Sequence, residues 1–447
     1  MTNAVTTAPA EPEEAPAPPP SKRDAIIVLG GLRQSAGTAM VDLMAQRLAR
    51  ALDHNAEDGT ATFALQEAKE EDYREANKCR VVTVSRKDAA GERPVADLYE
   101  LRYGDPLTAA YRRRPPIVQA LNIGWLLLLK LPMLLASVTK KSKTPSEKFH
   151  VLYGGFLFLL LAAYVPVLLA TVAATVQQAI ADTDAVATPP AAQSGTPAQP
   201  APRTSAKTAL VDRLVGLSQL LVVIGAAVGL FRRGSVKEAL SETAATMVPA
   251  LAYLDQDARA GLVRGQFQAL LEHLAEKAPT GTTYERVHVI GYSFGSLVAL
   301  DGLFPINPPG RRIGSIDTLV TVGCPFDFVR TYWDDYYTGR RALTGVPRRW
   351  LNIYTSLDVL SSDFKDTTGA EEGVRLEAGA GTNALVRPHD SVRLGRDRPL
   401  SLSQPLDYLS LIGFTAHGHY WEGKEVFDTN CFDIIASDLY KGRPALA

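Results

Sequence analysis

The chain has 447 residues, of which 46% are hydrophobic and 21% are charged, so it is long enough to bury a sizeable core. The formal net charge is −1 at pH 7, which gives no electrostatic indication of a nucleic-acid partner. The three cysteines, Cys79, Cys324 and Cys431, are odd in number and widely scattered. They fit neither a disulfide framework nor a zinc site, and they suit a reducing compartment.

The N-terminal part begins with a low-complexity segment and continues into strand patterns. Residues 1–23 are rich in Ala, Pro, Glu and Thr, so we expect a disordered tail. Ala25–Leu29 (AIIVL) predicts a short buried strand, and a helical pattern runs from Met40 to Leu52. Cys79–Ser85 and Val95–Tyr103 predict two further strands joined by a turn. Together these elements make residues 24–105 the first part of an α/β domain.

Residues 106–249 have a different composition and are predicted to form a membrane insertion. Two uncharged segments, at about 150–176 and 210–231, are long enough to span a bilayer, and a Pro-rich loop at 182–207 joins them. Lysine and arginine flank the pair, whereas the loop has few, so the positive-inside rule places both outer ends in the cytoplasm. The alternative is a pair of buried helices in a soluble cap.

Leu121–Val138 is also apolar, but it contains Lys130 and Pro132. The strands before and after the insertion must join one sheet, so the number of membrane crossings between them must be even. Because two crossings are already predicted, we expect this segment to lie in the membrane interface, with Lys130 reaching towards the polar region.

The motif that indicates chemistry lies in Val287–Leu300, VHVIGYSFGSLVAL. An apolar strand, the sequence Gly291-Tyr292-Ser293-Phe294-Gly295 and a helix-compatible run follow one another, as in the nucleophile elbow of an α/β-hydrolase sheet. The flanking glycines let the chains pass closely at a sharp turn. The elbow predicts Ser293 as the nucleophile and the Phe294 amide as an oxyanion donor. Leu32, in the turn after the first strand, is the candidate for the second amide, with Arg33 at the rim.

A serine nucleophile needs a base and an orienting carboxylate, which this fold supplies in the order Ser, acid, His. Asp358 follows the predicted strand Trp350–Thr355 and is the preferred acid. Asp363 and Asp327 are the alternatives.

The base candidates are His417 and His419, which lie in a late loop before a predicted closing helix. His389 also follows the acid but has weaker surroundings. No other His or Cys lies near the 417/419 pair in the sequence, so we expect no metal and no cofactor.

These motifs resemble those of bacterial membrane-associated α/β-hydrolases of the serine esterase/lipase class. Such proteins combine an H-G-I-G-type first loop, a Y-E-x-x-W strand, a G-x-S-x-G elbow, a G-S-P turn and a late H-x-x-Y-W. This chain has LYELRY, GYSFGS, GCP and HGHYW over roughly residues 24–104 and 250–435, with Gly30-Gly31 where His-Gly is usual. The H-x-x-Y-W match selects His417 over His419.

The resemblance implies an α/β-hydrolase sheet flanked by helices, with residues 250–447 as its second part and a transmembrane-hairpin insertion. It implies a serine hydrolase of the bacterial inner membrane, with the catalytic domain on the cytoplasmic side, that cleaves a lipid-like acyl ester or thioester. The alternative is a catalytically inactive fold that serves as a membrane scaffold or receptor. A transporter is disfavoured, because the predicted spans carry no charge that would line a pathway.

Overall fold

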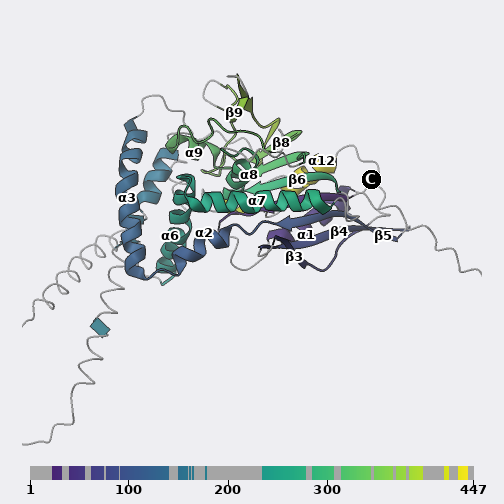
Figure 1. Cartoon of the computed structure of the whole chain (residues 1–447), viewed down its shortest axis with the longest axis horizontal. Coiled ribbons are helices and arrows are strands. Elements are labelled where there is room, and N and C mark those ends of the chain that lie inside the picture. Colours follow the sequence, from purple (N-terminus) through teal and green to yellow (C-terminus); the bar gives the residue numbers. More distant parts are fainter. Residues whose placement is uncertain are drawn as a thin grey trace, which may run out of the picture.

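The computed structural model shows a central β-sheet with helices packed around it (Figure 1). It describes residues 23–32, 40–55, 62–74, 77–89, 91–139, 150–159, 161–162, 164–165, 177–178, 234–277, 284–306, 314–343, 347–365, 369–378, 382–395, 417–421 and 431–440.

The short apolar runs of the sequence form the middle of a mixed, mostly parallel sheet. Within the described residues the strand order is β11-β8-β7-β6-β1-β5-β4-β2, and β3 pairs with β4. The strands are β1 Arg23–Leu29, β2 Thr62–Leu65, β3 Lys69–Arg74, β4 Asn77–Asp88, β5 Gly91–Glu100, β6 Tyr284–Tyr292, β7 Thr318–Val322, β8 Arg349–Tyr354 and β11 Asp390–Arg393, and a separate hairpin pairs β9 Val374–Ala378 with β10 Thr382–Val386.

Strand β1 lies between β5 and β6 and is parallel to both. The parallel series continues through β7 and β8 to β11, whereas β2, β3 and β5 all run antiparallel to β4. The carboxyl ends of the parallel strands therefore meet at one edge of the sheet, which is where open α/β sheets bind their ligands.

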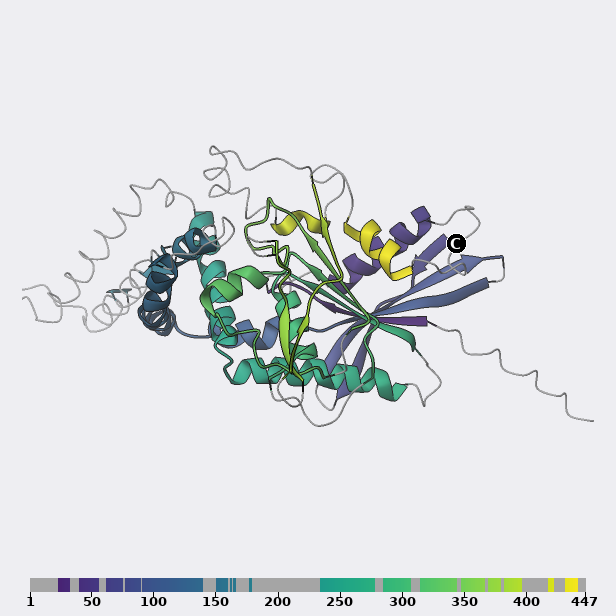
Figure 2. The same ribbon diagram turned by 90° about the horizontal axis from the view of Figure 1, so that it is seen from above.

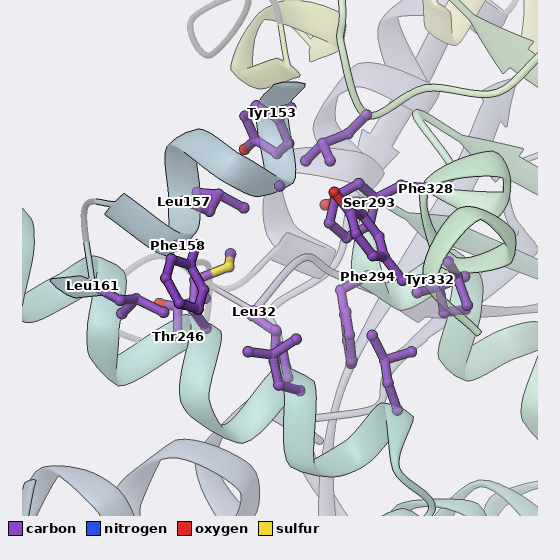
Figure 3. A pocket seen from close by; sticks show the side chains of 18 of the residues that line it. Leu32, Tyr153, Leu157, Phe158, Leu161, Thr246, Ser293, Phe294, Phe328 and Tyr332 are labelled. Atoms are coloured by element: carbon purple, nitrogen blue, oxygen red, sulfur yellow. The ribbon is translucent and has the colours of Figure 1, made fainter. Parts of the chain in front are cut away.

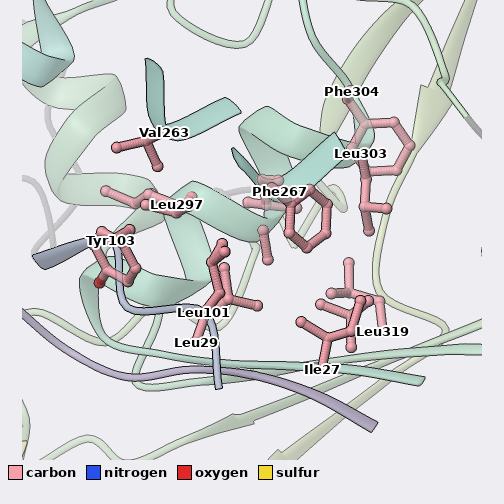
Figure 4. Packing of buried hydrophobic residues seen from close by; sticks show 14 of the residues in the cluster. Ile27, Leu29, Leu101, Tyr103, Val263, Phe267, Leu297, Leu303, Phe304 and Leu319 are labelled. Carbon is pink, nitrogen blue, oxygen red and sulfur yellow. The ribbon is translucent and has the colours of Figure 1, made fainter. Parts of the chain in front are cut away.

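Helices cover both faces of this sheet (Figure 2). Alternate residues of β1 belong to different cores: Ile26 and Val28 pack in the cluster that includes α1 (Met40–Asn55) and α12 (Cys431–Tyr440). Ile27 and Leu29 pack on the opposite face, against α7 (Ala258–Lys277) and α8 (Phe294–Leu303) (Figure 4). A strand buried on both faces reads as a continuous apolar run, which explains the sequence AIIVL.

The remaining helices gather at the end of the molecule occupied by α3 (Figure 1). These helices are α2 Gly104–Arg112, α3 Pro116–Thr139, His150–Leu159, α6 Gly234–Leu254 and α9 Phe326–Tyr332. A third apolar cluster, which includes Tyr111, Ile123, Leu161 and Val248, joins all of them except α9, whose Phe326 and Val329 belong to the core that contains α7 and α8.

The predicted α/β class is confirmed, and so are the strands around β1, β4, β5, β6 and β8 and the closing helix. The expected boundaries of the insertion, at 105/106 and 249/250, fall within α2 and α6. Most of the two predicted spans and the whole Pro-rich loop lie outside the described residues. Within the described part of the chain, Ile117–Thr139 of α3 is the one segment whose length and apolar composition would suffice for a membrane crossing.

The structure gives Lys130 a specific partner. Its ammonium group pairs with Asp255, just after α6, at 2.5 Å. It also lies 5.1 Å from the ring centroid of Trp333. The charge is thus turned inwards, because a carboxylate and an aromatic face are both available on that side.

Candidate active site

Ser293 stands at the end of β6, between the strand and α8. Its backbone has φ 55° and ψ −126°, a conformation that costs a residue with a Cβ on the order of 1–3 kcal/mol. The Ser293 amide donates to the Val322 carbonyl of β7 at 2.8 Å, so the neighbouring strand helps to hold the turn. A strained residue of this kind persists only when the surrounding structure holds it in place.

The two glycines that flank this turn are required by close approach. A Cβ on Gly295 would overlap the carbonyl oxygen of Leu29 in β1, and a Cβ on Gly291 would lie 2.6 Å from Cα of Ser296. Any larger residue at either position would push the turn away from the sheet. These close contacts explain why the G-x-S-x-G pattern has glycine at both positions.

His417 and Asp358 meet Ser293 in a continuous chain of hydrogen bonds. The Nε2 atom of His417 lies 2.6 Å from Oγ of Ser293, and its Nδ1 lies 2.7 Å from Oδ2 of Asp358. The imidazole is stacked on Tyr292, with ring centroids 5.5 Å apart, and the Tyr292 hydroxyl donates to the His417 carbonyl. The three predicted residues are thus brought together from segments that are far apart in the sequence.

Asp358 is buried, with 3% of its surface exposed, and it accepts further hydrogen bonds. Tyr420 donates to Oδ2 at 3.0 Å, and the Leu360 amide donates to Oδ1 at 2.9 Å. Burial raises the pKa of the Tyr420 phenol well above its usual value, so the hydroxyl keeps its proton and remains a donor. Tyr420 was not predicted as a partner of Asp358, although it is the tyrosine of the HGHYW motif.

The alternative acids lie elsewhere. Asp363 accepts from the Lys365 amide at 3.1 Å and caps a local turn. Asp327 is buried in α9 and pairs with Arg330 at 3.7 Å. Neither carboxylate is hydrogen-bonded to His417, so the geometry favours Asp358.

The alternative histidines are distinguished as well. His389 accepts from the Trp350 amide at 3.0 Å through Nδ1, so its imidazole is bound to the backbone of β8. His419 begins the short 3₁₀ turn His419–Trp421, and its side chain lies outside the described part of the structure.

The loop after β1 passes directly over the serine. A Cβ on Gly31 would lie 3.4 Å from Cβ of Ser293, and Leu32 and Phe294 both line the cavity at this point. The Tyr103 hydroxyl donates to the Gly30 carbonyl, and its ring stacks on Phe294 with centroids 6.4 Å apart. Tyr103 therefore connects the loop after β1 to Phe294, a role that its sequence position alone did not reveal. Arg33, the expected rim residue, lies outside the described residues.

A cavity of about 400 Å³ opens beside Ser293, a size typical of ligand pockets. Its walls come from α3, His150–Leu159, α6 and α9, and most of the lining side chains are apolar. Figure 3 shows Phe158, Leu161 and Thr246 at the end of the cavity away from Ser293. Such a space suits a long apolar group whose polar end is held at the serine.

Among the described residues, no group of three or more His, Cys, Asp or Glu side chains is placed to hold a metal ion. No family model, curated protein or solved structure matches the chain. The function must therefore be inferred from the geometry of this site.

Proposed function

We propose that the protein is a serine hydrolase with an α/β-hydrolase fold that cleaves an ester or thioester with a long apolar acyl group. The observation that carries this proposal is the continuous Ser293–His417–Asp358 chain at 2.6 and 2.7 Å. Hydrogen bonds of this length between nucleophile, base and orienting acid are the geometric requirement for an activated serine.

In the proposed reaction, Oγ of Ser293 attacks the acyl carbon while His417 Nε2 takes its proton. Asp358 accepts the Nδ1–H and stabilises the imidazolium that forms. The amides of Phe294 and Leu32 would stabilise the oxyanion. His417 then protonates the leaving alcohol or thiol, and water attacks the acyl-enzyme with His417 as base, releasing the acid and regenerating Ser293.

The apolar cavity supports a lipid-like acyl substrate, because burial of each methylene contributes about 0.8 kcal/mol. The predicted spans at 150–176 and 210–231 support anchoring to the bacterial inner membrane, with the catalytic domain on the cytoplasmic side. Both features would bring the serine close to a source of acyl chains.

Labelling with a fluorophosphonate probe tests the proposal, since only an activated serine reacts. We expect the detergent-solubilised protein to be labelled, and the Ser293→Ala and His417→Ala variants to be unlabelled. Labelling that survives Ser293→Ala would show that Ser293 is not the nucleophile. Absence of labelling in a folded wild type would favour the scaffold or receptor.

A further inference from the structure

Helix α3 has two apolar faces. Its inner face, which includes Leu127, Lys130 and Leu134, lines the cavity. Large apolar side chains on the opposite face are 56–67% exposed; they are Leu121, Trp125, Leu128, Leu129, Leu135 and Val138, here called the outer face of α3. A soluble protein rarely leaves an apolar surface of this extent without a partner.

Charge around α3 is distributed as a membrane surface would require. Lys130 is the one charged residue in Pro116–Thr139, and it is turned inwards to Asp255. The outer face is therefore uncharged along its whole length. Arg112 and Arg113 are exposed immediately before the helix, and the sequence continues after it with Lys140 and Lys141. Basic residues at both ends complement anionic lipid headgroups.

The contacts of α3 with the rest of the protein indicate how the helix would be oriented at a bilayer. Ile123 near one end and Ser137 near the other are both buried, so the helix lies against the protein along its length. A crossing helix would place the Lys130–Asp255 pair near the middle of the bilayer, where charged side chains are costly. Asp255 is instead 45% exposed, which fits a position on the aqueous side of a helix that lies in the membrane plane.

We propose that α3 lies flat in one leaflet of an anionic bilayer, with its outer face in the hydrocarbon, and so forms the wall between the bilayer and the cavity. For the role of the cavity this inference rests on the proposed function, since acyl chains would then reach Ser293 from the leaflet. The surface itself can be measured without turnover.

Site-directed spin labels on the full-length protein in anionic vesicles provide the test. All three native cysteines are buried, so a label reacts selectively with an introduced Leu128→Cys or Leu135→Cys. We expect these labels to collide more often with dissolved oxygen than with a water-soluble nickel chelate. Leu65→Cys, on the edge strand β2 and 40% exposed, is the matched control and should show the reverse preference.

Each other outcome overturns the proposal. Frequent collision with the nickel chelate at both α3 positions would place the face in water. Exclusion of both reagents would mean that protein covers it, either a second copy or another segment of this chain. Should the labelled variants not fold, quenching by brominated lipids decides: wild-type fluorescence should be quenched more than that of Trp125→Phe, and equal quenching would refute the docking. Neither result depends on fluorophosphonate labelling, so failure here and failure of the proposed chemistry are separable.

Discussion

The two sides of the cavity beside Ser293 are built in different ways. On the polar side, Ser293 and His417 line the cavity, and directional hydrogen bonds join them to Asp358, which in turn accepts from Tyr420. The apolar side, formed by α3, His150–Leu159 and α6, offers mainly aliphatic and aromatic surface. Hydrogen bonds fix positions, whereas apolar packing mainly sets volume. The polar side should therefore determine whether a bond is cleaved, and the apolar side which substrates are accepted.

The largest expected effect is on the polar side. Replacement Asp358→Asn should lower kcat by about 10⁴ for every acyl ester, because the imidazole would lose its orienting acceptor. Hydrolysis of butyrate and palmitate p-nitrophenyl esters measures this loss. Asp363→Asn is the control and should leave kcat unchanged. A loss confined to palmitate would show that the two sides are not functionally separate.

A substitution on the apolar side should change selectivity instead. Thr246 is buried at the far end of the cavity (Figure 3), so Thr246→Trp should fill the space that a long chain occupies. Each methylene that the indole excludes from the cavity loses about 0.8 kcal/mol of burial, so exclusion of about two to three methylenes should lower kcat/KM for palmitate esters about 10- to 100-fold.

The same variant should retain kcat/KM for butyrate esters, since a short chain does not reach Thr246. Leu262→Trp, at a half-exposed position of α7, is the matched control and should change neither value. An equal fall for both chain lengths would indicate general misfolding rather than a length limit.

A smaller effect on the polar side is expected for Tyr420→Phe. This change removes one of the donors to Asp358 but leaves His417 and the Leu360 amide in place. A hydrogen bond to a charged group contributes about 1.5–3 kcal/mol, so kcat should fall at least about tenfold, equally for short and long esters. Single-turnover kinetics with both esters would measure it, and an unchanged rate would mean that Tyr420 does not support the acid.

The smallest effect is expected for Lys130→Met. The Lys130–Asp255 pair is partly exposed, and such pairs contribute about 1 kcal/mol or less. Thermal unfolding should therefore change little, while α3 keeps its apolar contacts. A large drop in Tm would show that this ion pair, rather than packing, holds α3 over the cavity.

The elements that the sequence predicted are those whose signals are local. Buried runs such as AIIVL and the G-x-S-x-G turn predict β1, β6 and α8 from their own residues, without reference to distant parts of the chain. Strand β3, KEEDYR, was not predicted, since it has five charged residues and becomes a strand through pairing with β4. Strands β2 and β11 were not predicted because, at four residues each, they are too short to show a pattern.

Local sequence signals also predict one part of the candidate site and not the other. Motif position led to Ser293, Asp358 and His417, which the structure brings together. The hydroxyls of Tyr103 and Tyr420 were not predicted, because their partners, the Gly30 carbonyl and the Asp358 carboxylate, lie far away in the chain. A tyrosine in a sequence carries no sign of which distant oxygen it will meet.

The place of β1 between β5 and β6 has a consequence for synthesis. About 180 residues separate the end of β5 from the start of β6, so a ribosome needs on the order of 10–40 s to make them. During that interval β1 has one partner and one open edge. The sheet of the nascent chain therefore stays incomplete while the predicted membrane segments are synthesised. Since His417 appears last, a nascent chain has no base for Ser293 until nearly the whole protein has been made.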